Sequence, residues 1–145
     1  MVVEEEIITG NNRVFLDNGS VINRYSHVLS GAVIGENVMI GQGCYVGSKV
    51  VIGDNTRIQN DVSLYDGLTL GKNVFVGPKV IFTNHHNPAI RDNFVYDLTY
   101  IGDNSTLCAG CIIIAPCDIK SNSKIAAGAI ITKNIMDEEW KMRVY

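Results

Sequence analysis

The chain has little charge and no surplus of basic residues. Of its 145 residues 19% are charged, and 12 Lys and Arg stand against 15 Asp and Glu, for a formal net charge of −3. Proteins that bind nucleic acid or anionic lipid need concentrated positive charge, so neither nucleic acid nor a membrane is expected as a partner. No apolar run reaches the roughly 20 residues of a membrane-spanning helix, and the opening segment MVVEEEIITG lacks the positive start of a secretion signal. We therefore expect a cytoplasmic protein.

The four cysteines do not have the spacing of a metal site. Paired CxxC motifs are typical of structural zinc sites, whereas here only Cys108 and Cys111 have that spacing, and Cys44 and Cys117 stand alone. We expect no metal. Hydrophobic residues make up 46% of the chain, which at this length is sufficient for one compact domain over 1–145.

A six-residue repeat runs through most of the sequence. Aliphatic residues occupy every sixth position from Leu16 to Val76, and Phe82 follows at the same spacing. Helices have apolar residues three or four positions apart, so the repeat is not helical. Short Val- and Ile-rich strands that bend at Gly, Asn or Asp predict an all-β fold, a parallel β-helix in which each coil pairs with the next. Small or medium-sized residues stand four positions after each aliphatic: Ser20, Ser26, Ala32, Val38, Cys44, Val50, Thr56, Val62, Leu68, Val74 and Val80.

The resemblance to hexapeptide-repeat proteins implies three hexads per coil, left-handed winding and about six coils. In this frame Cys44, Cys111 and Cys117 occupy the small inward position, and we interpret them as core residues. Cys108 stands where the repeat usually has Gly, and a nucleophilic role for it is the weaker alternative. Residues 1–15 are expected to form an N-terminal cap and residues 136–145 a C-terminal cap.

The repeat stops after Phe82 and resumes at Ile101, 19 residues later. This spacing is not a multiple of six, so a segment has been inserted. Residues 84–100, NHHNPAIRDNFVYDLTY, include Pro88, which cannot donate to a strand ladder. We predict an extended loop that leaves the solenoid at a corner. Long loops in compact repeats are usually functional, and a tolerated surface insertion is the alternative.

Stacking at 18-residue offsets predicts which residues lie beside the root of this loop. One column contains Asp66 and Asn84, and the neighbouring one contains Lys49, Gly67 and His85. A carboxylate, a carboxamide and a histidine together can orient an amine and accept its proton near neutral pH. The alternatives are that Asp66 only forms an Asp-Gly turn and that His85 and the adjacent His86 are solvated.

Three segments carry a more specific resemblance: INRYSHVLSGAVIGENVMIGQGCYVG, IQNDVSLYDGLTLGKNVFVGPKVIFTN and IAAGAIITKNI. Over about residues 15–135 the chain is similar to the left-handed β-helix N-acetyltransferases that act on nucleotide-linked amino sugars, especially the 3-amino sugar enzymes of surface-polysaccharide biosynthesis. The SLYDG and VIFTN motifs at this spacing distinguish that group from other hexapeptide acetyltransferases.

The resemblance implies a homotrimer that uses acetyl-CoA to acetylate a dTDP- or UDP-linked amino-deoxyhexose. It implies that Asn84 bonds the sugar amine, with His85 as candidate base and Asp66 beside them. The candidate substrate-binding residues are Tyr65, His86 and Arg91. Acetyl-CoA is expected between neighbouring solenoids, along a column of small residues and near one cation: Ala109, Gly110, Ala127, Gly128 and Lys133. Lys141 and Arg143 are further phosphate candidates, and Trp140 a candidate for stacking on adenine.

Two features of the sequence limit the substrate and leave alternatives. Related enzymes for uronic acid sugars have Arg directly after the loop proline, whereas here Ala89 follows Pro88, so we favour a neutral deoxyhexose. An O-acetyltransferase acting on a sugar hydroxyl and a non-catalytic trimeric scaffold are the alternatives. A carbonic-anhydrase-like metal enzyme would need three converging histidines, but His27 is expected on another face, in an outward column with Tyr45.

Overall fold

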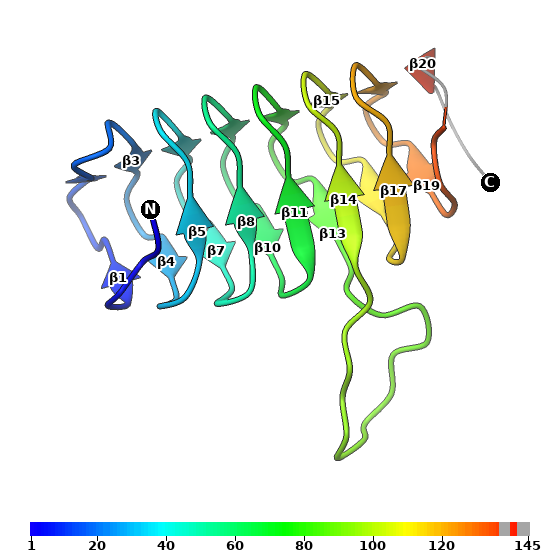
Figure 1. The fold of residues 1–145 in the computed structure, drawn as a ribbon, viewed down its shortest axis with the longest axis horizontal. Helices are drawn as coiled ribbons and strands as arrows, with labels where there is room; N and C mark the ends of the chain where they lie inside the picture. Colours follow the sequence, from blue (N-terminus) through cyan, green and yellow to red (C-terminus); the bar gives the residue numbers. More distant parts are fainter. Residues whose placement is uncertain (137–139, 142–145) are drawn as a thin grey trace.

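The computed structural model describes residues 1–136 and 140–141, and every regular element in them is a β-strand. The strands form a triangular parallel solenoid of about six left-handed coils, with one loop projecting from a corner (Figure 1). No helix in the described part could cross a membrane. The predicted all-β hexapeptide solenoid is therefore confirmed, and the C-terminal cap expected over 136–145 falls mostly outside the described residues.

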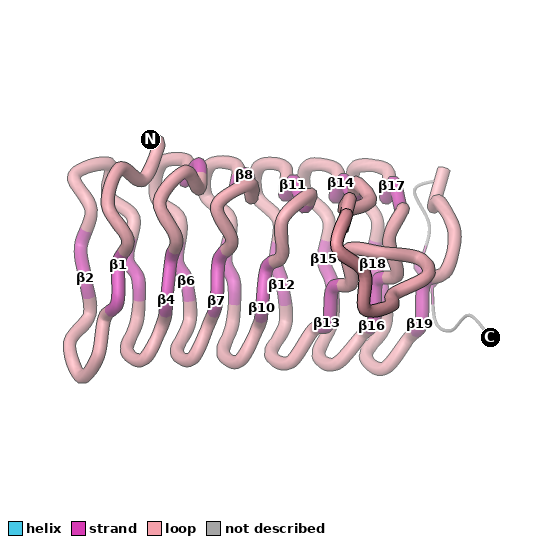
Figure 2. The backbone as a smooth tube through the Cα atoms, turned by 90° about the horizontal axis from the view of Figure 1, so that it is seen from below, coloured by secondary structure: helices cyan, strands magenta, loops and turns pink. Residues whose placement is uncertain are grey.

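Each coil contributes one short strand to each of three sheets (Figures 1 and 2). The five-stranded sheet contains β5 (Val33–Ile34), β8 (Val51–Ile52), β11 (Leu68–Leu70), β14 (Thr99–Ile101) and β17 (Cys117–Ile119). The seven-stranded sheet contains β1 (Ile7–Ile8), β4 (His27–Val28), β7 (Tyr45–Val46), β10 (Ser63–Leu64), β13 (Ile81–Phe82), β16 (Ile112–Ile113) and β19 (Ile130–Ile131). The eight-stranded sheet contains β2 (Val14–Phe15), β3 (Val21–Ile22), β6 (Met39–Ile40), β9 (Arg57–Ile58), β12 (Phe75–Val76), β15 (Thr106–Leu107), β18 (Lys124–Ile125) and β20 (Trp140–Lys141).

The register between coils gives the length of the insertion. Val33 pairs with Val51, an offset of 18 residues, and most parallel pairs keep this offset. Across the loop Leu70 pairs with Ile101, an offset of 31, which exceeds 18 by 13. The loop therefore adds 13 residues without shifting the register of the coils that follow.

The core is one continuous column inside the triangle. Every sixth residue from Ile22 onward is almost fully buried, and so is the predicted small inward position four residues later in each hexad. Cys44, Cys111 and Cys117 are among these buried residues and are free thiols, as predicted, while Cys108 is half-buried. Burial raises the pKa of the Cys111 thiol to about 12, so this group stays protonated and packs as a small apolar side chain.

Buried hydroxyls are tolerated in the core because each one joins two coils. Ser20 Oγ accepts a hydrogen bond from Val38 N at 2.9 Å and donates to Gly35 O at 2.9 Å. Thr56 Oγ1 does the same with Val74 N and Gly71 O. Each hydroxyl thus satisfies a backbone group at a corner, where the strand ladders are interrupted.

Aspartates at the corners explain the glycine that follows many aliphatic positions. Asp66 Oδ1 accepts a hydrogen bond from Lys49 N of the previous coil at 3.0 Å. A Cβ added at Gly47 would overlap this carboxylate oxygen, so only glycine leaves room for it. Asp54 and Asp103 bind Glu36 N and Lys72 N in the same way at 2.8 Å.

The structure differs from the sequence prediction at two boundaries. Leu16 packs against the core, but strand β2 before it pairs antiparallel with β3, so the regular parallel coils begin one hexad later. The projecting loop covers 83–98 rather than 84–100, because Thr99 and Tyr100 already pair with Leu68 and Thr69 in β14. The hexad frame resumes before its first aliphatic residue, which the sequence repeat alone does not mark.

We expect replacement of Ile52 by Ala to lower the free energy of unfolding by about 2–5 kcal/mol, because Ile52 is only 1% exposed and the cavity would remain. Val51→Ala in the same strand is the matched control, since Val51 points outward and is 38% exposed. Urea unfolding followed by circular dichroism measures both. An equal loss in the two variants would contradict the inward orientation of the sixth-residue series.

Candidate functional site at the root of the loop

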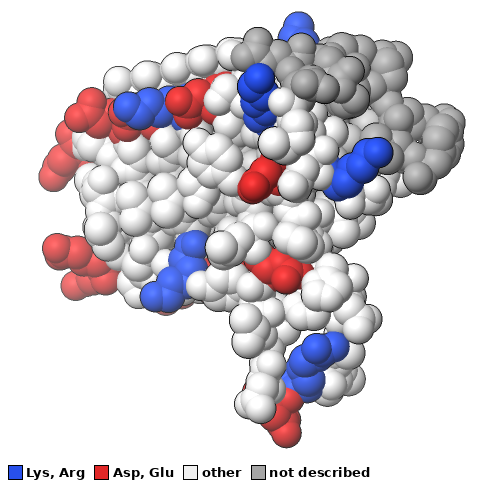
Figure 3. Space-filling view, turned by 45° about the vertical axis from the view of Figure 1, so that its right-hand side comes forward, with Lys and Arg blue, Asp and Glu red and all other residues white. Residues whose placement is uncertain are grey.

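The loop projects from the corner between the seven-stranded and five-stranded sheets (Figures 1 and 2). Its two ends are joined, because Asp97 N donates to Asn84 O at 2.8 Å and Thr99 N donates to Gly67 O at 3.0 Å. In the space-filling view it stands out from a largely uncharged wall of coils, with charged side chains on its far part (Figure 3). The loop is therefore a closed projection with a defined root.

Two adjoining hollows lie at this root. The larger, of about 280 Å³, is lined by Tyr65, Phe82, Thr83, Asn84, His85, Pro88 and Phe94. The smaller, of about 140 Å³, is lined by Asp61, Ser63, Tyr65, Val80, Ile81 and Phe82. They share Tyr65 and Phe82, so together they form a groove, hereafter the root groove, from the loop across the outer face of the seven-stranded sheet. Apolar and aromatic walls with a few polar groups are typical of small-molecule sites.

Asn84 lies directly above Asp66, as the 18-residue stacking predicts. The contact is between Asn84 Nδ2 and the backbone oxygen of Asp66, at 3.4 Å. The Asp66 carboxylate instead turns toward Lys49 N and lines neither hollow. The structure therefore gives this carboxylate a corner-closing role, which was the alternative interpretation of the sequence.

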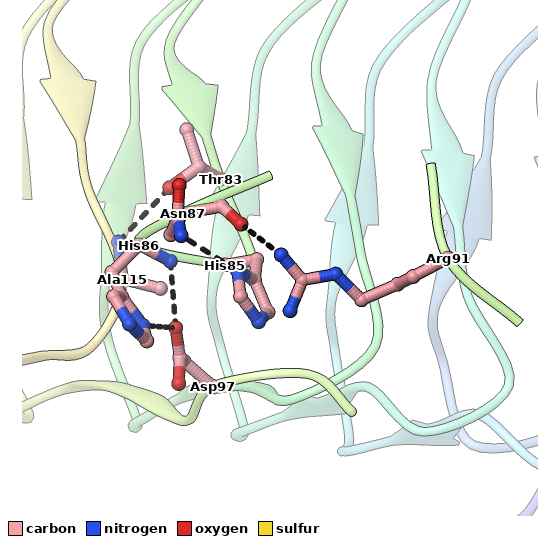
Figure 4. A network of polar contacts seen from close by, with 7 residues as sticks. All are labelled: Thr83, His85, His86, Asn87, Arg91, Asp97 and Ala115. Atoms are coloured by element: carbon pink, nitrogen blue, oxygen red, sulfur yellow. Dashed lines mark hydrogen bonds and ion pairs between the residues drawn. The ribbon is translucent and has the colours of Figure 1, made fainter. Parts of the chain in front are cut away.

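The histidine pair is held by a carboxylate that the sequence prediction missed. Asp97 Oδ2 accepts hydrogen bonds from His86 N at 2.7 Å and from His86 Nδ1 at 2.8 Å (Figure 4). These bonds hold the pKa of the Asp97 carboxyl below its usual range, so the group is ionised at neutral pH. The signal was in the register: with the offset of 31 across the loop, Asp97 takes the position above Asp66 on the returning strand.

His85 has a different set of neighbours. Its ring stacks on His86 with centroids 4.8 Å apart and an interplanar angle of 13°, and contacts Phe94 at 5.4 Å. Its Nδ1 accepts a hydrogen bond from Asn87 N at 3.0 Å. Arg91 Nη2 donates to Asn87 O at 3.0 Å, which brings the guanidinium close to this ring (Figure 4). Of the two histidines, only His85 lines the root groove.

His85, His86 and Asp97 offer metal-type ligand atoms within 4.8 Å of one another. The lone pair of an imidazole nitrogen lies in the plane of its ring, and two stacked, nearly parallel rings cannot both direct a lone pair at one ion. The third histidine is elsewhere: His27 pairs with Tyr45 in the seven-stranded sheet, as predicted, and bonds Glu6. The arrangement therefore does not bring three histidines together.

The predicted CoA-binding residues fall at two separate places. Ala109 and Ala127 stack, since Gly128 N donates to Ala109 O at 3.0 Å, and Gly110 and Gly128 have φ of +67° and +71° with open space outside. This column, hereafter the small-residue edge, lies at the corner between the eight-stranded and seven-stranded sheets. Lys133 is exposed at the other corner, two coils beyond Asn84 in the same column. Arg143 and the side chains of Trp140 and Lys141 lie outside the described part of the chain.

Comparison with known proteins agrees with this architecture. The family model described as bacterial transferase hexapeptide (six repeats) matches residues 13–48, 49–84 and 98–133, and it omits the inserted segment between Asn84 and Leu98. A second model, the hexapeptide repeat of succinyl-transferase, matches 31–66.

Curated relatives cover only part of a longer protein. The bifunctional protein GlmU of Acetivibrio thermocellus is 34% identical over 120 residues, which is 83% of this chain and 24% of that protein. GlmU of Limosilactobacillus fermentum is 36% identical over 115 residues, which is 79% of this chain and 24% of that protein. The chain thus spans about a quarter of the length of these relatives.

Solved structures share the fold at low identity. The acetyltransferase domain of PglB from Neisseria gonorrhoeae, solved with acetyl coenzyme A, has a TM-score of 0.71 at 19% identity, covering 83% of this chain and 53% of that chain. A mutant perosamine N-acetyltransferase from Caulobacter crescentus, in complex with CoA and GDP-perosamine, has a TM-score of 0.69 at 16% identity, covering 89% and 53%. With three matched blocks that cover most of its coils, the chain belongs to the bacterial transferase hexapeptide family.

Proposed function

We propose that this protein is an acetyl-CoA-dependent N-acetyltransferase that acts on the amino group of a dTDP- or UDP-linked amino-deoxyhexose, with a 3-amino sugar favoured over a 4-amino sugar. The observation that carries the proposal is the root groove, where Asn84 and a carboxylate-held histidine pair converge beside apolar walls. Two solved proteins with this fold support it, one bound to acetyl coenzyme A and one to CoA and a GDP-linked amino sugar.

The groove suits a neutral amine nucleophile. Asn84 Nδ2 is turned toward Asp66 O, which leaves Asn84 Oδ1 to accept a hydrogen from the acceptor amine. Tyr65, Phe82 and Phe94 supply apolar surface, which disfavours the ammonium form by desolvation. The amine attacks the thioester carbonyl, a C–N bond forms, and the C–S bond breaks as CoA thiolate leaves. The amine proton goes to a base and finally to the thiolate.

The geometry favours His86 over His85 as that base. Asp97 is an ionised acceptor, so His86 Nδ1 carries the hydrogen of their bond and His86 Nε2 keeps a free lone pair. A histidine oriented by a carboxylate in this way is the usual arrangement of a general base. His85 was the base candidate from sequence, and its own role is taken up below.

The two halves of the proposed site come from different subunits. The loop root and the small-residue edge lie at opposite edges of the seven-stranded sheet, which is about five residues or roughly 15 Å wide. Between them the outer face carries Ile81 and Ile130, 51% and 40% exposed. An apolar face of this kind is a candidate for burial between copies. We therefore propose a homotrimer in which acetyl-CoA binds on the small-residue edge of one subunit opposite the loop of its neighbour, with Lys133, and Arg91 on the loop, available for phosphates.

One observation favours a second candidate, an O-acetyltransferase acting on a sugar hydroxyl. The His86–Asp97 pair resembles what a hydroxyl acceptor requires, because an alkoxide is harder to form than a neutral amine and needs a strong general base. The two acceptors therefore differ in how strongly they depend on Asp97.

Replacement of Asn84 by Ala is expected to lower kcat/KM for the amino sugar by about 10- to 100-fold, because one hydrogen bond to the amine is lost. The assay follows thiol release from acetyl-CoA over a panel of 3-amino and 4-amino dTDP- and UDP-sugars. Asn93→Ala, on the exposed part of the same loop, is the control. Full activity of Asn84→Ala would remove this residue from the site.

Replacement of Asp97 by Asn separates the two acceptor classes. For an amine, we expect a decrease of about 10-fold in kcat, because the leaving thiolate can accept the proton; for a hydroxyl, general-base loss predicts about 100- to 10,000-fold. Asp92→Asn, exposed in the same loop, is the matched control. The larger decrease, measured with the best acceptor, would favour O-acetylation.

Subunit complementation tests the shared site. Asn84→Ala damages the loop half and Ala127→Trp blocks the small-residue edge, so each variant alone is expected to have little activity. Random mixed trimers should regain function at about a quarter of their sites, since the two intact halves can meet across an interface. Co-expression with two affinity tags supplies the mixture. Mixed trimers with no recovered activity would mean that both halves act within one chain.

A further inference from the structure

His85 and His86 are neighbours in the chain and stack on each other, yet their surroundings fix opposite ring nitrogens. His86 Nδ1 faces the ionised Asp97 carboxylate at 2.8 Å, so it is a donor, and the neutral ring has its lone pair on Nε2. His85 Nδ1 faces Asn87 N at 3.0 Å. A backbone N–H can only donate, so His85 Nδ1 is an acceptor and its neutral ring carries the hydrogen on Nε2.

The surroundings also oppose a second proton on His85. A hydrogen on Nδ1 would point at the Asn87 N–H and break the bond between them. The Arg91 guanidinium, held on Asn87 O, lies close to the same ring (Figure 4), and His86 is stacked against it. Phe94, the remaining ring in contact, contributes no negative charge. Each of these neighbours favours the neutral form, so His85 is poorly placed to serve as a base.

The root groove has few hydrogen-bond donors for a bound oxygen atom. No Lys or Arg lines it, and the Asn84 amide group is directed at Asp66 O. Thr83 Oγ1 already accepts from Ala115 N at 3.0 Å. The remaining donors are side-chain hydroxyls and the Nε2 hydrogen of His85. A neutral imidazole can polarise a carbonyl or bind a hydroxyl without adding charge to the site.

We propose that His85 remains neutral during turnover and donates its Nε2 hydrogen to an uncharged oxygen of the bound substrates, while His86 takes the proton. This division of roles rests on the proposed function, because it assigns a partner to a group in the same groove. The oxygen is either the acyl carbonyl, which becomes negative as the amine attacks, or a hydroxyl of the sugar. The first predicts a loss in kcat on removing the donor, and the second a rise in KM.

The first test needs no substrate. Nitrogen-15 NMR of protein labelled only at histidine observes three side chains, which His27→Gln, His85→Gln and His86→Gln assign. We expect His85 to show a protonated Nε2 and an unprotonated Nδ1, and neutral His86 the reverse. A protonated Nδ1 on His85, or an imidazolium at neutral pH, would overturn the proposal whatever the substrate.

The second test uses two replacements of the same residue. The side-chain amide of Gln reaches the position of Nε2 and can donate from it, whereas the amide of Asn reaches only Nδ1. We expect His85→Gln to retain activity within about 10-fold and His85→Asn to lose about 100-fold, the usual effect of removing one such donor. A retained His86–Asp97 signal in the NMR spectrum shows that both variants keep the loop. Equal losses would overturn the donor role. If the tautomers are as expected but no amino sugar is turned over, the proposed function fails and the assignment of the donor stands.

Discussion

Every functional argument about this molecule depends on the in-register hydrogen bonding between successive coils. Because each coil repeats the backbone path of the previous one after 18 residues, Val33, Val51 and Thr69 lie in one column although the chain makes a full turn between each pair. A shift of one residue would turn inward side chains outward. The buried aliphatic column makes such a shift unfavourable, since each fully buried Ile or Leu contributes roughly 1.5–3 kcal/mol of hydrophobic stabilisation.

The same register explains why a 13-residue insertion is tolerated at one corner. The chain leaves the solenoid above Asp66 at Asn84 and returns above Asp66 at Asp97, and the two are joined by a hydrogen bond from Asp97 N to Asn84 O. The insertion therefore begins and ends in one column, and the next coil continues without a shift. The Asp97 carboxylate then holds His86 through two bonds, so the return strand also orders the outgoing one.

The repeating part of the molecule was predictable from sequence, and the inserted part was not. The buried series, the inward cysteines and the contact between Asn84 and the Asp66 column follow from a six-residue period, because side-chain direction is set by position in the coil. The loop has no such period. The orientation of His86 depends on Asp97, 11 residues later, and that of His85 on Asn87 N two residues later. These are local contacts between irregular backbone segments, for which spacing gives no rule.

Asp66 shows why the repeat itself is a poor source of chemistry. Its carboxylate appeared from sequence to be a site residue, yet it is bound to Lys49 N, as Asp54 and Asp103 are bound to the coils beneath them. In a solenoid each corner leaves backbone N–H groups that the strand ladders do not reach, and these polar side chains are needed to satisfy them. A carboxylate or carboxamide at a corner is thereby committed to the adjacent coil. Groups free to meet a substrate must come from residues outside the repeat, which is where Asn84, His85, His86 and Asp97 lie.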